Sequence, residues 1–163
     1  MITQGRVINS YGANVYVKVP VTNTNGDFSG KVISTLNAEG IKLNVTAIMT
    51  VDQVEQVVSA VNHDTDTIIS IFAGRIADTG RDPCPTIETA AQICRNSDNL
   101  KTLWASTREA YNLVQAENSG ADIITITPAV IKKLDSFGTD LIDFSRDTVQ
   151  MFFEDGQAAG FEI

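Results

Sequence analysis

The stretch VYVKVPV at residues 15–21 decides the fold, because it is a short β-branched run with a single charge at its centre. Runs of this kind favour strands, in which successive side chains point to opposite faces. The valines therefore share one face, which suits packing against helices. Lys18 shares the other face with Tyr16 and Pro20, and we expect it to point into a cleft or a barrel interior.

Strand-like and helix-like segments alternate from this run to the end of the chain. The predicted strands are residues 14–21, 43–49, 66–73, 101–105 and 122–127. The predicted helices are residues 26–39, 51–61, 86–94, 107–118, a helix that starts at Pro128, and 140–153. Five β-α units with short links imply parallel strands and right-handed crossovers.

Two architectures fit this alternation: an open doubly wound sheet, or part of a (β/α)8 barrel. No glycine-rich phosphate fingerprint follows the first strand, which counts against a nucleotide-binding sheet. The chain has 163 residues, fewer than the roughly 200 of the shortest eight-unit barrels. The sequence therefore predicts an α/β fold, with residues 1–163 forming one incomplete domain: a partial TIM (β/α)8 barrel of about five parallel β-α units plus a C-terminal helix.

The composition narrows the class of partner. The net charge is −8 and the pI about 4.5, which argues against nucleic acid or an anionic membrane as a partner. A phosphorylated substrate stays possible, because a few local cations can hold one phosphate. No apolar run is long enough to cross a membrane, and residues 1–10 lack the apolar core of a secretory signal. The spacing of Cys84 and Cys94 fits no metal or disulfide signature, so we expect a reduced, cytoplasmic protein.

A lysine inside a strand has a possible chemical use. Burial disfavours the charged amine and lowers its pKa, and a neutral amine attacks carbonyl groups. Lys18 is therefore a candidate nucleophile. The alternative is a lysine on an edge strand whose long side chain reaches solvent.

Polar residues recur near the ends of the following strands. We expect three sets of residues to share a face within their strands: Asn44, Thr46 and Ile48; Ser70 and Phe72; and Trp104 and Ser106. In parallel α/β folds the carboxyl ends of the strands carry the functional site. Any one of these residues could instead serve packing, so it is their recurrence that suggests a pocket.

Two arginines follow these strands, Arg75 in FAGR and Arg108 in WASTR. With the Ser106 hydroxyl they could clamp a phosphate. The alternative is two unrelated surface arginines. Arg81 is predicted to lie on a surface loop, and His63 to be an exposed residue without a role.

The run VYVKVPVT at residues 15–22 resembles the active-site strand of transaldolases and of the related fructose-6-phosphate aldolases. The resemblance continues, in order, through LNVTAIM (43–49), IFAGRI (71–76), LWASTR (103–108) and DIITITP (122–128). It implies that Lys18 forms a Schiff base, that Thr46 lies beside it, and that Arg75, Ser106 and Arg108 bind the substrate phosphate. Asn44, Ser70 and Phe72 would complete the pocket.

The resemblance also implies a reaction. The Lys18 amine would form an iminium with a ketose phosphate, and a dihydroxyacetone unit would pass to an aldose phosphate in the pentose phosphate pathway. No metal or organic cofactor is needed, because the iminium is the electron sink. Phe72 stands where fructose-6-phosphate aldolases carry a proton-transferring tyrosine, which favours transaldolase proper over that alternative. The family further suggests a homo-oligomer whose C-terminal helix reaches the next subunit.

One departure from the family is large. Its lysine lies on the fourth strand of a full barrel, whereas Lys18 lies on the first strand here. The three earlier family strands, with an aspartate, a Thr-Asn-Pro motif and an acid/base glutamate, have no counterpart. Acid–base assistance is commonly worth about 10² to 10⁴ in rate, so we expect weak catalysis or none from these residues alone. The chain is expected to be a truncated enzyme; the alternatives are a fragment that pairs with another chain, and a non-catalytic sugar-phosphate-binding or assembly module.

Overall fold

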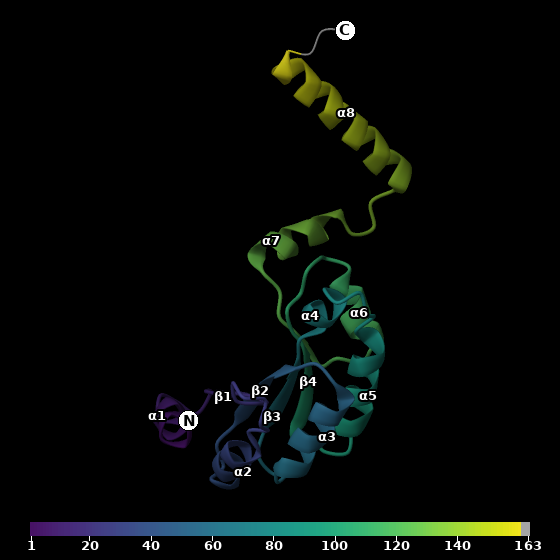
Figure 1. The fold of residues 1–163 in the computed structure, drawn as a ribbon. Coiled ribbons are helices and arrows are strands. Elements are labelled where there is room, and N and C mark those ends of the chain that lie inside the picture. Colours follow the sequence, from purple (N-terminus) through teal and green to yellow (C-terminus); the bar gives the residue numbers. More distant parts are fainter. Residues whose placement is uncertain (161–163) are drawn as a thin grey trace.

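A computed structural model describes residues 1–160 and contains one parallel sheet. Its strands are β1 (Val17–Pro20), β2 (Leu43–Ile48), β3 (Thr67–Ile71), β4 (Leu100–Trp104) and β5 (Ile123–Ile124). They lie side by side in chain order, and each pairs with the next in parallel (Figure 1). All five predicted strands are therefore confirmed, although β5 is shorter than predicted.

The helices are α1 (Ile2–Asn9), α2 (Gly30–Ala38), α3 (Val51–Ala60), α4 (Ala73–Ala77), α5 (Cys84–Cys94), α6 (Asn112–Asn118), α7 (Pro128–Ile131), the 3-10 helix η1 (Lys132–Ser136) and α8 (Leu141–Ala159). Helices α1, α2, α3, α5 and α6 form a row in which each packs on the next. This row covers one face of the sheet (Figure 1). A doubly wound sheet has helices on both faces and a reordered strand sequence, so the fold is a part of a (β/α)8 barrel, as predicted.

The core lies between the sheet and this row of helices. Val17, Val19 and Val21 are 1–3% exposed and form the predicted valine face of the first strand. They join the buried faces of β2 and β3 and the inner sides of α2 and α3 in one cluster. Helix α3 begins with a capping box in which Thr50 and Gln53 satisfy each other's backbone N–H groups, a common start signal.

Strand β2 contains a bulge that changes which residues share a face. Val45 pairs with Ile69 and Ile48 with Ile71, so two residues of β2 lie opposite Ser70 alone. Ala47, one of those two, has a φ of 63°. Ile48 consequently returns to the buried helix side, and the prediction that it shares a face with Thr46 is wrong.

Trp104 also lies on the other face from the one predicted. It pairs with Ile71 and is 1% exposed within the core beneath the helices. The register therefore removes it from the polar face, where we had placed it together with Ser106.

Several helix boundaries differ from the predicted ones. Helix α1 was not predicted at all; it packs closely on α2, since a Cβ built on Gly5 would lie 2.7 Å from Leu36 Cδ1. Residues 107–111 form a loop instead of the start of a helix, and the short α4 follows β3 directly.

Helix α8 projects away from the sheet (Figure 1). It contains the predicted C-terminal helix and extends it to residue 159, and none of its residues is buried. Its exposed large apolar residues are Leu141, Ile142, Phe144, Val149, Met151, Phe152 and Phe153. Across residues 1–160, no helix has the length and apolar character needed to cross a membrane.

Candidate functional site

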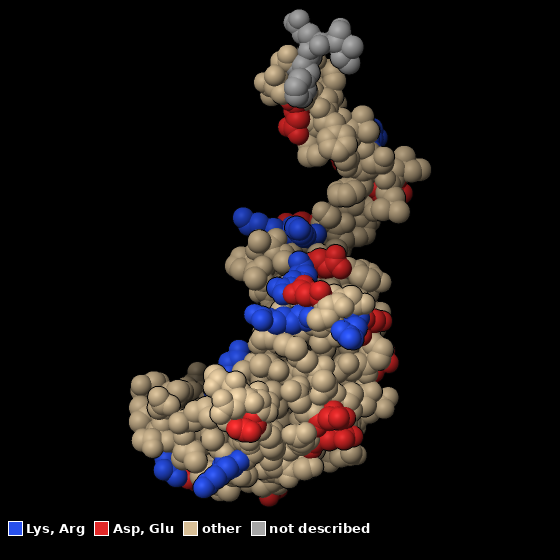
Figure 2. Space-filling view, viewed as in Figure 1, with Lys and Arg blue, Asp and Glu red and all other residues tan. Residues whose placement is uncertain are grey.

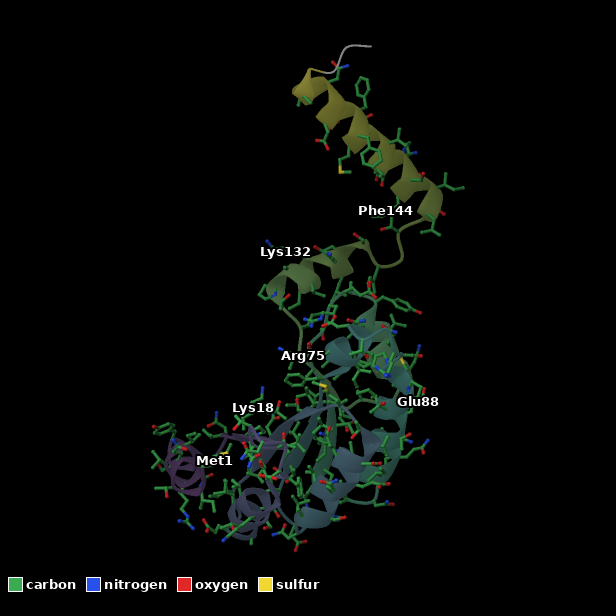
Figure 3. The ribbon with its side chains drawn as sticks, in the orientation of Figure 1. Met1, Lys18, Arg75, Glu88, Lys132 and Phe144 are labelled. Atoms are coloured by element: carbon green, nitrogen blue, oxygen red, sulfur yellow. The ribbon has the colours of Figure 1, made fainter. Side chains whose placement is uncertain are left out.

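Lys18 lies on the face of the sheet that the helices do not cover. It pairs in register with Asn44 of β2, and the same row continues through Ile68 to Lys101. Figure 3 shows Lys18 and Arg75 on the side of the molecule away from Glu88 of α5. The predicted direction of the side chain, opposite to the valine face, is therefore correct.

Lys18 is exposed, however, so its predicted burial is wrong for this chain. The reason is its position: β1 is an edge strand, and within residues 1–160 its neighbours in the fold are β2 and α1. A hollow of about 550 Å³ runs along this edge, lined by apolar and polar residues of α1 and by Val17, Lys18 and Val19. The contribution of α1 was not predicted; its signal in the sequence was the apolar pair Val7 and Ile8.

Two polar atoms beside Lys18 lack partners. Asn44 Oδ1 and Thr46 Oγ1 are both buried, and neither has a hydrogen-bond partner among the described residues. Thr46 pairs with Pro20 in the strand register, two residues further along the strands than the pair Lys18 and Asn44. Buried polar groups are normally paired, so these two atoms have hydrogen-bonding capacity available for a ligand.

Ser70 and Phe72 lie further along the same face. Ser70 is 1% exposed and stands opposite the β2 bulge. Phe72 is half-buried and precedes α4, with its ring centroid 5.9 Å from the Arg75 guanidinium carbon. Phe72 therefore links the sheet face to the arginine that follows β3.

The loops after β3 and β4 touch at Gly74. A Cβ built on Gly74 would lie 1.7 Å from the Ser106 carbonyl oxygen and 3.1 Å from Arg108 Cγ. Only a residue without a side chain allows this approach. The structure thus brings the Ser106 backbone and Arg108 Cγ close to Gly74, which directly precedes Arg75 in the chain. That the three residues form one phosphate site stays a prediction.

Ser106 and Arg108 are held by their surroundings. Ser106 has a φ of 66°, a left-handed conformation that is uncommon for residues other than glycine and that clusters at functional sites. The Arg108 backbone N–H donates to Asn112 Oδ1 at 2.9 Å. The Arg108 side chain pairs with Asp78, donating from Nε to Oδ1 at 3.3 Å and from Nη2 to Oδ2.

Charged side chains of both signs gather at this end of the protein. Figure 2 shows several Lys and Arg side chains near α4 and α7, with Asp and Glu side chains among them. Against a net charge of −8, the basic side chains give this region a local supply of cations.

A second polar cluster lies at the opposite ends of the strands and was not predicted. The Tyr16 hydroxyl donates to Asp66 Oδ2 at 3.1 Å, and Lys42 Nζ lies 3.6 Å from the same oxygen. Burial, with the hydrogen bond and the charge of Asp66, raises the pKa of Tyr16. The sequence does contain a signal for this cluster: Lys42 and Asp66 each come directly before a strand, so both lie at the amino-terminal edge of the sheet.

The remaining candidates have structural roles. Arg81 lies on an exposed loop, as predicted, and donates to the Thr79 hydroxyl at 2.9 Å. His63 is half-buried rather than exposed, because its Nε2 lies 3.0 Å from the Val58 carbonyl oxygen. Cys84 and Cys94 are free thiols. Burial raises the pKa of both, that of Cys94 to about 12, which makes them poor nucleophiles.

The family model and the curated relatives agree on one family. The family model described as Transaldolase/Fructose-6-phosphate aldolase matches residues 1–163. A probable transaldolase of Nitrosopumilus maritimus is 34% identical over 136 residues, covering 82% of this chain and 58% of that protein. One of Caldicellulosiruptor saccharolyticus is 35% identical over 136 residues, covering 82% and 59%. One of a Ruegeria species is 33% identical over 165 residues, covering 100% and 70%. The chain thus spans 58–59% of the length of the first two relatives.

Proposed function

Because this chain belongs to the transaldolase/fructose-6-phosphate aldolase family, we propose that it takes part in transaldolase-type transfer of a dihydroxyacetone unit between sugar phosphates, with Lys18 forming the Schiff base. The observation that carries the proposal is the pairing of Lys18 with Asn44, beside two buried polar atoms that lack partners within residues 1–160. A lysine, an amide and a hydroxyl on one face form a suitable set for a polar ketose.

The reaction balances without a redox partner. The Lys18 amine adds to the ketone, and loss of one water gives a protonated imine. The C4 hydroxyl of the ketose then gives up its proton, the bond between C3 and C4 breaks, its electron pair moves into the imine to give an enamine, and an aldose phosphate leaves. The three-carbon enamine on Lys18 attacks the carbonyl carbon of a second aldose phosphate, whose oxygen takes up a proton, and water then hydrolyses the imine to release the product ketose phosphate and the free amine. Thr46 and Asn44 would hydrogen-bond the bound unit.

The phosphate of the substrate would be held by Arg75, Ser106 and Arg108. The segments that carry these residues meet at the Gly74 contact, and guanidinium groups bind phosphate through paired hydrogen bonds. Their loops follow β3 and β4, whereas Lys18 lies on β1. A sugar phosphate would therefore extend across the uncovered face from one to the other.

An exposed amine is a weak starting point for this chemistry. Water solvates the ammonium form well, and attack on a carbonyl requires the neutral form. We therefore expect full rate only when further chain covers the face on which Lys18 lies. That cover would come from additional β-α units, in the same polypeptide or in another. We further propose that the chain acts in the cytoplasm as a homo-oligomer, in keeping with its two free cysteines and the exposed apolar face of α8.

Of two other functions, aldolase cleavage is disfavoured by the structure and a binding module is favoured by one observation. Fructose-6-phosphate cleavage without an acceptor is disfavoured, because Phe72 is half-buried near Arg75 and has no hydroxyl for proton transfer. A non-catalytic sugar-phosphate-binding module is favoured by one observation, the exposure of Lys18. In that case the arginine cluster would bind and Lys18 would stay unreacted.

Borohydride trapping tests the proposal. The folded chain is incubated with fructose 6-phosphate and reduced, and any mass adduct is located by peptide mapping. We expect an adduct on Lys18 that is absent from Lys18→Ala. Lys101→Ala is the matched control, since Lys101 lies in the same row on the same face and its side chain is 50% exposed; this variant should keep the adduct. Phosphate binding without any adduct would favour the binding module.

A further inference from the structure

The side chain of Arg108 is already held on one side by a carboxylate. Asp78 accepts from both Nε and Nη2 of Arg108, so the pair is bidentate. Asp78 directly follows α4, three residues after Arg75. Arg108 thus reaches from the loop after β4 to the end of the helix after β3.

This pairing leaves donors free for a second anion. A guanidinium carries five N–H donors, and Asp78 engages one on Nε and one on Nη2. Three donors remain for a phosphate, on Nη1 and Nη2. Asp78 can therefore fix the plane of the guanidinium while three of its five N–H donors stay available.

The backbone of Arg108 is fixed as well. Its N–H donates to Asn112 Oδ1. The side-chain torsions are left to be set, and the contact with Asp78 restricts them. An arginine ordered before binding loses less conformational freedom when the ligand arrives.

Stability does not explain the ion pair. The Arg108 and Asp78 side chains are 49% and 55% exposed, and exposed ion pairs contribute little to folding. We propose that Asp78 is a positioning residue that orders Arg108 for the phosphate group of a sugar phosphate. This inference rests on the proposed function, because it assumes that Arg108 binds phosphate.

Electrostatics and ordering of Arg108 predict opposite effects of an Asp78 substitution on phosphate affinity. Asp78→Asn removes a negative charge next to the site, so simple electrostatics would tighten phosphate binding. Ordering of Arg108 predicts that binding weakens, by about three- to tenfold for one mobile side chain. Glu109→Gln is the matched control, since Glu109 is exposed and adjacent to Arg108. This substitution removes the same charge and leaves the pairing of Asp78 with the Arg108 guanidinium in place.

The experiment is calorimetric titration of the folded chain with fructose 6-phosphate and with inorganic phosphate, at one low ionic strength. Asp78→Asn should bind both ligands about three- to tenfold more weakly than Glu109→Gln, and Asp78→Glu should recover part of the loss. Adding Asp78→Asn to Arg108→Gln should cause no further loss. In the unliganded chain, the Arg108 Nε–H signal in nitrogen-resolved NMR should broaden in Asp78→Asn.

The outcomes separate this inference from its premise. If Arg108→Gln weakens binding while Asp78→Asn binds as tightly as Glu109→Gln, the positioning role is wrong and the phosphate site stands. If the wild-type chain binds neither ligand, the phosphate site is wrong and the positioning role falls with it. A loss in Asp78→Asn that persists in the Arg108→Gln background would also overturn the inference, because the effect would not pass through Arg108.

Discussion

A Cβ atom on Gly74 would lie 1.7 Å from the carbonyl oxygen of Ser106. The backbone of α4 therefore touches the backbone of the loop after β4, and Arg75 directly follows this contact in the chain. Gly74 is also buried, so a methyl group added there would have no open space to occupy.

Gly74→Ala should separate the two loops. We expect a loss of about 1–3 kcal/mol in the free energy of unfolding, the usual cost of overpacking, together with a large loss of phosphate affinity. Urea unfolding and titration with fructose 6-phosphate measure the two effects. Gly156→Ala is the control: nothing lies within 4 Å of a Cβ at this position in α8, and alanine favours helix by up to about 1 kcal/mol. Equal behaviour of the two variants would contradict the close contact at Gly74.

Thr46→Val should stabilise the protein while impairing any chemistry. The Thr46 hydroxyl is buried without a partner among residues 1–160, and such a group costs about 1–3 kcal/mol. Valine keeps the shape and removes that cost, so the free energy of unfolding should rise by about 1 kcal/mol. The borohydride adduct on Lys18 should decrease. A destabilised Thr46→Val would mean that the hydroxyl has a structural partner.

Ala47 should tolerate glycine but not valine. Its φ of 63° is strained for a β-branched residue, so Ala47→Val should lower the free energy of unfolding by about 1–3 kcal/mol. Ala47→Gly should change it by less than about 1 kcal/mol, because relief of the strain offsets the greater freedom of the unfolded chain. Urea denaturation of both variants checks the bulge; similar midpoints would argue against it.

The single tryptophan reports the register of β4. Trp104 is 1% exposed and lies on the helix side of the sheet with Ile71. Its fluorescence should be shifted to the blue relative to the unfolded chain and should be quenched weakly by acrylamide. Binding of sugar phosphate on the other face should leave the emission unchanged. Strong quenching in the folded protein would place Trp104 on the uncovered face.

Alkaline pH should destabilise the fold through Cys94. Burial raises the pKa of this thiol to about 12, above the ordinary value near 9, so the folded state keeps a proton that the unfolded state releases. The stabilisation is fully present below pH 9 and is lost as pH rises toward 12. In that window the free energy of unfolding should fall by about 1.4 kcal/mol per pH unit for this group. Cys94→Ala should show a shallower slope, and equal slopes would contradict the shifted pKa.

The sequence predicted the strands well because their signal is local. The alternation of valines with Lys18 fixes both the strand and its two faces, and each later strand repeats a similar run. The faces of Ile48 and Trp104 were mistaken because a bulge at Ala47 and the pairing with Ile71 depend on neighbouring strands. Simple alternation within one strand contains no information about either.

Helix α1 was missed, and the exposure of Lys18 was given only as the alternative interpretation, for related reasons. A glycine at the centre of ITQGRVIN argues against a helix by propensity, yet Gly5 is what allows α1 to approach Leu36. The burial of Lys18 depends on what lies beyond β1, and a strand pattern does not show whether the strand is an edge. Conversely, the contact between the segments after β3 and β4 could be predicted, because the ends of neighbouring parallel strands meet at one edge of a sheet.

The two edge strands of the sheet, β1 and β5, are both short. Strand β1 has four residues and ends on Pro20, which has no N–H, and β5 has two; both therefore offer few unpaired backbone groups to another chain. In the proposed oligomer a partner would be recruited mainly through side chains, and mass action would set the fraction of chains whose Lys18 face is covered. On that proposal the covered and uncovered forms would differ in reactivity at Lys18, and dilution would lower the activity.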